Sequence, residues 1–250
     1  MPSNHGKNEE RTAEYFKKFS REKVLSFLLN KKKPVIFDVG SNDGMSLQQF
    51  KSIWPDSEVH CFEPQIECWD ELEQLSQKTH SVYINKFGVG STDSDEVEFF
   101  THDLNSGISG FNKINIKSKD SIDLKKFSIS KDEIDSYKKT INHSRLVKLR
   151  RLDNYIISQG IEHIDLLKLD TQSYELEVLK GMGNCLSNVS LLLTELKFYD
   201  YYEQSLSFFD LESLLIPHNF ALYDICHIAK NPMNGRTDWV DVLYVNQKLL

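Results

Sequence analysis

The sequence predicts a doubly wound α/β fold, in which helices cover both faces of a largely parallel sheet. Two observations lead to this fold class. Apolar segments of strand length alternate along the chain with segments of helical periodicity, as in consecutive strand-helix-strand units. The strand expected over residues 35–39, Val-Ile-Phe-Asp-Val, is almost continuously apolar, which is typical of a strand covered on both faces. We therefore expect right-handed crossovers between parallel strands.

The expected elements follow one another in a regular order. Residues 1–10 are polar and are expected to be disordered, whereas residues 12–29 place apolar side chains at helical spacing. The expected strands are residues 35–39, 59–62, 82–86, 96–101, 164–170, 189–193, 220–226 and 239–245. The expected later helices are residues 47–53, 67–77, 175–179 and 208–215.

The chain is expected to form one domain. With 250 residues and 40% hydrophobic content it can bury one substantial core. We expect residues 1–34 to form an N-terminal tail and helix, and residues 35–250 to form the domain itself. Residues 112–144 lose the apolar periodicity and are expected to be an insertion, either a substrate lid or a solvated segment.

Charge and apolar content restrict the partners and the location. The net charge is 30 minus 37, or −7, so no basic field attracts nucleic acid. No run approaches the roughly 20 apolar residues of a spanning helix, so we expect a cytoplasmic protein without membrane insertion. The helix over residues 12–29 is expected to pack on the sheet or on a partner, which leaves a homo-oligomer open.

The loop after the first expected strand has the composition of a nucleotide-binding turn. Gly40 and Gly44 permit a sharp turn and close backbone approach, and a helix follows them. The dinucleotide fingerprint needs a third glycine that is missing here, which argues against NAD. Glu63 lies 25 positions after Asp38, at the end of the second strand. An acid at this place can accept hydrogen bonds from ribose hydroxyls. Taken singly, each acid could instead be an ordinary strand-end acid or a helix cap.

The sequence from about Val35 to Asn246 resembles the FkbM-type family of S-adenosylmethionine-dependent methyltransferases. The motifs that carry the resemblance are Asp38-Val39-Gly40-Ser41-Asn42-Asp43-Gly44, Phe62-Glu63-Pro64, Leu152-Asp153, Leu167-Lys168-Leu169-Asp170, Glu175 to Gly181, Glu195 and Asp241 to Val245. Their shared order is more specific than any one of them. The chain departs from the family at Ser41, usually alanine, and at Gln172-Ser173, where many members have Glu-Gly.

The resemblance implies a Rossmann-like methyltransferase sheet with an antiparallel last strand, and S-adenosylmethionine as cofactor. The loop and the resemblance together give the expected cofactor-binding residues: Asp38, Gly40, Ser41, Asn42, Gly44, Glu63, Pro64, Phe87, Gly88 and Val89. Residues 87–89 could instead be a simple strand-to-hairpin turn. Similar proteins have a serine-rich loop near residues 104–110, which makes Ser106 and Ser109 candidates for contact.

Asp170 and Glu195 each end one of two neighbouring expected strands, so both should lie at the same edge of the sheet. Two such carboxylates can act as general bases or can bind a divalent metal such as Mg or Mn, and they can also cap the following segments. His227, after the strand at 220–226, is a third catalytic candidate.

Polar and aromatic residues late in the chain are candidates for the acceptor pocket. Tyr199, Tyr201 and Tyr202 could stack on a sugar ring or nucleobase, or could form a packed aromatic cluster. Arg236 and Asp238 could line the acceptor pocket or belong to a surface loop.

The resemblance implies O-methylation of a hydroxyl on a sugar or nucleotide-activated sugar, in the biosynthesis of a surface glycan such as capsule or lipopolysaccharide. The alternatives are O-methylation of a lipid-linked or polyketide-type hydroxyl, and a non-catalytic cofactor-binding scaffold. A dehydrogenase is disfavoured by the missing glycine.

Overall fold

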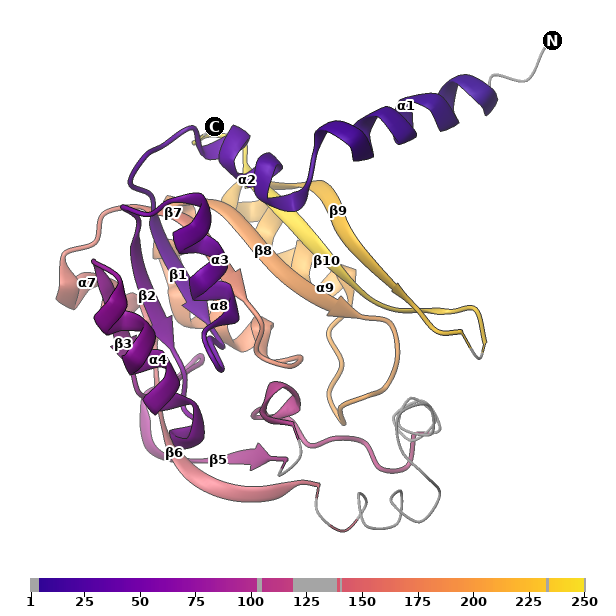
Figure 1. The fold of residues 1–250 in the computed structure, drawn as a ribbon. Coiled ribbons are helices and arrows are strands. Elements are labelled where there is room, and N and C mark those ends of the chain that lie inside the picture. The colour runs from indigo at the N-terminus through magenta and orange to yellow at the C-terminus, as the bar shows by residue number, and fades with distance from the viewer. Residues whose placement is uncertain (1–4, 103–104, 119–138, 140, 233, 250) are drawn as a thin grey trace.

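A seven-stranded sheet forms the centre of the molecule in a computed structural model, which describes residues 5–102, 105–118, 139, 141–232 and 234–249 (Figure 1). The strand order is β3-β2-β1-β7-β8-β10-β9. The bounds are β1 Val35–Val39, β2 Glu58–Phe62, β3 Val82–Asn85, β7 Ile164–Leu169, β8 Val189–Lys197, β9 Phe220–Lys230 and β10 Thr237–Asn246. The first five strands in this order pair in parallel, and β10 pairs antiparallel with both β8 and β9. The predicted doubly wound sheet with a reversed last strand is confirmed.

Among the described residues, six helices cover both faces of this sheet: α2 Arg21–Leu29, α3 Met45–Ile53, α4 Ile66–Lys78, α7 Leu152–Gln159, α8 Glu175–Met182 and α9 Phe208–Leu215. A further helix, α1 His5–Lys18, precedes them. Buried side chains of α2, α3 and α4 form one core against the sheet, and those of α7, α8 and α9 form a second core on the opposite face. In the described part of the chain, no helix is long and apolar enough to cross a membrane.

The N-terminal prediction is wrong in two respects. Helix α1 begins at His5, within the segment expected to be disordered, and the expected single helix over residues 12–29 is broken. Ser20 has an extended backbone and its hydroxyl accepts a hydrogen bond from the Lys23 amide at 3.4 Å, so a new helix begins at Arg21. Helix α1 projects from the body of the molecule (Figure 1). The Tyr15 hydroxyl donates to the Asp224 carboxylate on β9 at 2.8 Å.

A second, three-stranded sheet was not predicted. It has the order β4-β6-β5, with bounds β4 Gly88–Val89, β5 Ser94–Thr101 and β6 His143–Arg150. It lies beyond the carboxyl ends of β1 and β2 (Figure 1). Strand β6 buries only Val147 and Leu149, so its sequence has too weak an apolar pattern to identify it.

Only the two ends of the expected insertion can be described. Residues 119–138 and 140, on which the lid hypothesis rests, lie outside the described residues. The Asn142 side chain bonds both the amide and the carbonyl of Ile114, at 2.8 and 2.9 Å. Ile114 in turn forms a β-bridge with Tyr202. The start of the insertion is therefore tied to the loop that follows β8.

Candidate active site

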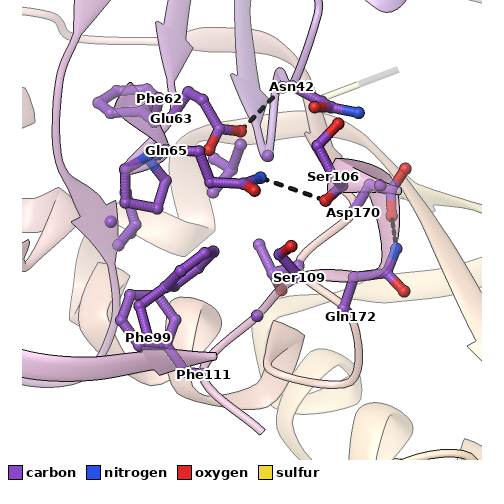
Figure 2. Close-up of a pocket in the computed structure, with 18 residues that line it drawn as sticks. Asn42, Phe62, Glu63, Gln65, Phe99, Ser106, Ser109, Phe111, Asp170 and Gln172 are labelled. Atoms are coloured by element: carbon purple, nitrogen blue, oxygen red, sulfur yellow. Dashed lines mark hydrogen bonds between the residues drawn. The ribbon is translucent and has the colours of Figure 1, made fainter. Parts of the chain in front are cut away.

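A pocket lies at the carboxyl ends of β1, β2 and β7, where a doubly wound sheet binds its ligands (Figure 2). Its volume, counted to the open mouth and including open solvent, is about 510 Å³. It is lined by Val39, Gly40, Asn42, Phe62, Glu63, Pro64, Gln65, Gly88, Val89, Phe99, Ser106, Gly107, Ser109, Gly110, Phe111, Asp170, Thr171 and Gln172. We call it the first pocket.

Six of the ten predicted cofactor-binding residues line the first pocket. These are Gly40, Asn42, Glu63, Pro64, Gly88 and Val89. Asp38, Ser41, Gly44 and Phe87 do not line it, and Ser41 lines a separate hollow on the loop together with Gly40, Asn42 and Asp170. Ser106 and Ser109, also predicted, line it from the short 3-10 turn η1 (Ser106–Ile108) and the residue after that turn.

The glycine loop has the left-handed backbone that its sequence requires. Gly40 has a φ of +80°, and a Cβ there would lie 2.0 Å from the Asp170 carbonyl oxygen. Only glycine therefore lets β1 and β7 end side by side at this point. Gly44 has a φ of +84°, and its Cβ would meet the Leu75 side chain of α4 at 2.5 Å. Gly44 thus serves helix packing, whereas Gly40 shapes the pocket.

A buried lysine, missed by the sequence analysis, neutralises the acids behind this loop. Lys168 Nζ lies 3.2 Å from Asp38 Oδ1 and 3.7 Å from Asp170 Oδ2, and it donates to the Gly40 carbonyl at 3.1 Å. Burial acts to lower the pKa of Lys168, but the carboxylates of Asp38 and Asp170 raise it above its usual value. Asp38 also accepts from the Ser46 hydroxyl at 2.6 Å. A lysine just before the end of the largely apolar and buried strand β7 was the signal that could have found it.

Glu63 is the buried carboxylate of the first pocket. It is 3% exposed, and its two oxygens accept the backbone amides of Asn42 and Gln65, each at 2.8 Å. Burial raises the pKa of Glu63 to about 7, although these hydrogen bonds act in the opposite direction. The carboxyl group is therefore fixed in place and close to balance between its two protonation states at neutral pH.

The far wall of the first pocket comes from the second sheet and the loop beside it. Phe99 on β5 and Phe111 place their rings 5.0 Å apart, edge to face. Gln65 donates through its side chain to the Ser106 carbonyl at 3.2 Å, which ties the loop to the rim of β2. Figure 2 shows Glu63 and Gln65 facing Asp170 and Gln172 across the pocket. Phe99, Phe111 and Gln65 were not predicted as site residues, although a strand over residues 96–101 was expected; the second sheet that places Phe99 beside the pocket was not recognised.

Gln172 connects Asp170 to a buried tyrosine. Its Nε2 donates to Asp170 Oδ1 at 2.7 Å, and its Oε1 accepts from the Tyr202 hydroxyl at 2.6 Å. Because a carboxylate can only accept, this contact sets which way the Gln172 amide points. Gln172 and Ser173 both have a left-handed backbone, with φ of 59° and 68°. Such strain costs of order 1–3 kcal/mol per residue and is usually found at functional sites.

A second pocket adjoins the first. Its volume, counted to the open mouth, is about 720 Å³. It is lined by Gly107, Ile108, Gln172, Glu195, Lys197, Tyr199, Tyr201 and Trp239. Gly107 and Gln172 line both pockets, so the two hollows share a wall. Tyr202 does not line the second pocket.

The two predicted carboxylates lie at the same edge of the sheet but face different pockets. Asp170 lines the first pocket, and Glu195 lines the second, where it pairs with Lys197 on the same strand. Burial raises the pKa of Glu195, Lys197 partly offsets this, and the charge of Asp170 adds to it. Glu195 is therefore a carboxylate with increased proton affinity in an open, partly apolar pocket.

His227, Arg236 and Asp238 line neither pocket. His227 is exposed on the edge strand β9, where it pairs in register with Asp241. The structure does not bring it together with Asp170 or Glu195. Asp238 is buried 3.8 Å from the Arg236 guanidinium, which packs over the Tyr199 ring at 5.2 Å. This pair lies behind the Tyr199 wall of the second pocket.

The described residues do not form a preassembled metal site. No group of three or more His, Cys, Asp and Glu side chains within them is arranged to hold a metal ion. Asp170, bonded to Gln172, and Glu195, paired with Lys197, are each engaged with a partner of their own. We therefore derive no step through a metal.

The sheet order, with pockets at the carboxyl edge of its parallel strands, is that of a Rossmann-like α/β fold that binds its ligands at this edge. The sequence profile described as the methyltransferase FkbM domain matches residues 38–224, so the chain belongs to this family. The family predicted from the sequence motifs is confirmed.

Two curated relatives and one solved structure show the range of similarity. The chain is 28% identical over 190 residues to the 2-O-methyltransferase NoeI of Sinorhizobium fredii, covering 72% of this chain and 70% of NoeI. It is also 28% identical over 163 residues to the AMB antimetabolite synthetase AmbE of Pseudomonas aeruginosa, covering 60% of this chain and 8% of AmbE. The crystal structure of methyltransferase FkbM from Methylobacillus flagellatus shares the fold, with a TM-score of 0.50 and 15% identity. The match covers 86% of this chain and 44% of that longer chain.

Proposed function

We propose that this methyltransferase uses S-adenosylmethionine to methylate a hydroxyl of a sugar or nucleotide-activated sugar, in the biosynthesis of a surface glycan. The observation that carries the proposal is the pair of adjoining pockets that share Gln172 and Gly107. A cofactor pocket and an acceptor pocket must meet in this way for a methyl group to pass between them. Transfer to oxygen is also supported by the similarity to NoeI, which is named a 2-O-methyltransferase. The glycan context rests on the family resemblance.

The residues of the first pocket fit S-adenosylmethionine. Glu63 offers a buried carboxylate at the end of β2 that can accept ribose hydroxyls. Phe99 and Phe111 offer aromatic surface to the adenine, beside the backbone of Gly88 and Val89. The close approach of the chain at Gly40 leaves backbone groups facing the ligand. When bound, the cofactor supplies a methyl group that leaves its sulfur for an acceptor oxygen, with the C–S electron pair remaining on sulfur.

Asp170 suits a positioning role at the cofactor. Its carboxylate lines the first pocket, with Gln172 on one oxygen and Lys168 near the other. A carboxylate held in this way can orient the amino group of the cofactor through a charge-assisted hydrogen bond. Because Asp170 does not line the second pocket, its influence on turnover is expected to come through the position of the cofactor.

Glu195 suits the role of general base for the acceptor hydroxyl. It is the only carboxylate among the described residues that line the second pocket. Burial raises its pKa, which brings its proton affinity closer to that needed at neutral pH. The ion pair with Lys197 favours the ionised form of Glu195, which is the form that can take a proton. The hydroxyl proton passes to a Glu195 oxygen as the acceptor oxygen bonds to the methyl carbon.

S-adenosylhomocysteine is expected to bind the protein with a stoichiometry near one in calorimetric titration, while NAD at the same concentration gives no heat of binding. The missing third glycine of the dinucleotide fingerprint is the reason for this selectivity. Failure of S-adenosylhomocysteine to bind would overturn the cofactor assignment. Binding of NAD instead would point to a dehydrogenase.

Glu195→Gln is expected to lower turnover about 10²-fold or more, because a positioned general base contributes about 10²–10⁴-fold. The affinity for S-adenosylhomocysteine is expected to stay within about twofold, since Glu195 lies outside the first pocket. The assay follows transfer of a tritiated methyl group to a panel of nucleotide-activated hexoses and methyl glycosides, with and without EDTA.

The matched variants for this assay are Asp170→Asn and Glu162→Gln. The first is expected to reduce both turnover and cofactor affinity, and the second, at an exposed residue before β7, to change neither. If Glu195→Gln and Asp170→Asn both keep full turnover, the assignment of these residues is wrong. Loss of turnover in EDTA would restore the metal alternative.

A further inference from the structure

Resting on the proposed function and extending it, we propose that the second pocket is a sugar-binding site in which the Trp239 indole stacks against one face of a neutral pyranose ring. The Glu195–Lys197 pair then meets the hydroxyl edge of the ring. Such a ring could come from a simple glycoside or from a nucleotide-activated sugar.

The position of Trp239 carries the proposal. Trp239 on β10 pairs in register with Lys197 on β8, so both side chains stand on the same face of the sheet. Of the three aromatic side chains that line the second pocket, Tyr199 and Tyr201 are 7% and 4% exposed, whereas Trp239 is only half-buried. Trp239 therefore has ring surface left to offer a ligand.

The two tyrosines form a rigid wall beside that indole. Their ring centroids lie 5.6 Å apart at an interplanar angle of 81°. Tyr201 in turn packs edge to face on Tyr202 at 4.9 Å. These tyrosines form a buried cluster with Ile114 and Ile141, and the partly buried side chains of Trp239 and Ile108 pack against it. The cluster supports the pocket, and Trp239 forms its accessible aromatic surface.

A pyranose ring matches this combination of groups. Each face of the ring has apolar C–H groups that pack on an aromatic plane, and its edge has hydroxyls that both donate and accept. Lys197 can only donate and Glu195 can only accept, so the pair can bond two neighbouring hydroxyls. Glu195 and Lys197 are the charged residues among the described residues that line the second pocket, and their charges are opposite. The pocket lining is therefore neutral, which favours a neutral ring over an anionic group.

The wall between the pockets determines where the ring meets the methyl donor. Gln172 is held from both sides by Asp170 and Tyr202, at 2.7 and 2.6 Å. The Tyr202 hydroxyl also lies 3.0 Å from the Ile108 carbonyl oxygen, on the same wall. Because this wall is fixed, the orientation of the ring on Trp239 decides which hydroxyl lies nearest the first pocket. Trp239 is thus a determinant of which position is methylated.

The test uses saturation-transfer NMR on the full chain saturated with S-adenosylhomocysteine. The probes are methyl glycosides of glucose, galactose, mannose and N-acetylglucosamine, and the UDP derivatives of glucose and N-acetylglucosamine. Saturation transfer to the ring C–H protons of at least one probe is expected. Trp239→Ala is expected to weaken that binding about tenfold or more. Trp239→Phe, which keeps an aromatic plane, is expected to retain part of it and tests the proposal if the alanine variant does not fold.

Tyr223→Ala is the matched control, since Tyr223 is a 50% exposed aromatic side chain on the edge strand β9 and lines neither pocket. It is expected to bind sugar like the wild type. All three variants should bind S-adenosylhomocysteine within about twofold of the wild type. A wild type that binds S-adenosylhomocysteine but none of the sugars, or variants of Trp239 that bind them unchanged, would overturn the sugar site while leaving the cofactor assignment intact. Loss of S-adenosylhomocysteine binding in the wild type would instead overturn the proposed function itself.

Discussion

Replacing Gly40 with alanine is expected to destabilise the protein by about 2–5 kcal/mol and to abolish binding of S-adenosylhomocysteine. The left-handed backbone alone costs a non-glycine residue about 1–2 kcal/mol. The new Cβ would also lie 2.0 Å from the Asp170 carbonyl oxygen, and overpacking of this kind costs about 1–3 kcal/mol.

The strands beside Gly40 cannot easily move apart to make room. The Gly40 amide donates to the Phe62 carbonyl and the Asp170 amide donates to the Val39 carbonyl, each at 3.0 Å. These bonds hold β2, β1 and β7 together at the floor of the first pocket. Any shift that accommodates the methyl group therefore also displaces Glu63 and Asp170, on opposite sides of that pocket. The measurements are denaturant unfolding and calorimetric titration.

Gly160→Ala separates the two causes. Gly160 also has a left-handed backbone, with a φ of +65°, but a Cβ there would meet nothing within 4 Å. Its substitution should cost only the conformational part, about 1–2 kcal/mol, and should leave binding unchanged. Equal destabilisation by the two substitutions would show that the overlap at Asp170 is unimportant. A Gly40→Ala variant that binds S-adenosylhomocysteine normally would contradict the position of the cofactor.

The central sheet could be predicted from the sequence because its strands are covered on both faces. Strands β1, β7 and β8 are nearly continuous apolar runs, and each is buried along most of its length. Where such a strand stops, a polar residue marks the edge of the sheet, as Glu63 and Asp170 do. The order of these residues along the chain was enough to place them at one edge.

The remainder of the site depends on contacts that the local sequence does not encode. Strand β6 buries only Val147 and Leu149, so its weak apolar pattern did not reveal the second sheet, although the strand over residues 96–101 that contains Phe99 was expected. The left-handed backbone of Gln172 and Ser173 is imposed by tertiary contacts, because neither residue prefers it. Trp239 joins the second pocket through its pairing with Lys197, 42 positions away along the chain, and through its packing on the tyrosine cluster.

Glu63→Gln is expected to remove a pH dependence that the wild type shows both in stability and in ligand binding. The folded pKa of Glu63 is about 7, against 4.5 for the exposed group, because burial disfavours the charged form. Since the folded pKa is raised, the stabilising contribution is fully present below about pH 4.5 and is lost as pH rises to about 7. At about 1.4 kcal/mol per pKa unit, this loss is of order 3 kcal/mol for the protein without ligand.

Ligand binding should depend on pH in the opposite direction. An ionised Glu63 has both oxygens free of protons and can accept ribose hydroxyls beside the two backbone amides, whereas the protonated group loses acceptor capacity. Affinity for S-adenosylhomocysteine should therefore rise about tenfold from pH 6 to pH 8 in the wild type, since the ionised fraction rises by about that factor around a pKa near 7. Glu63→Gln should bind weakly at both pH values.

Other groups also titrate between pH 5 and pH 8. The effect of Glu63 is therefore taken as the difference in free energy of unfolding between the wild type and Glu63→Gln. Urea unfolding from pH 5 to pH 8 should show the wild type losing stability relative to the variant as pH rises when no ligand is present. Saturating S-adenosylhomocysteine should reduce or reverse that trend, because the ligand binds the ionised form. Glu162→Gln, at an exposed glutamate, should follow the wild type under both conditions. If the free energies of unfolding of the wild type and Glu63→Gln differ by the same amount at pH 5 and pH 8, with and without ligand, then Glu63 neither titrates near neutrality nor contacts the ribose. If the sign of that difference changes with pH only when ligand is bound, the carboxylate contacts the cofactor.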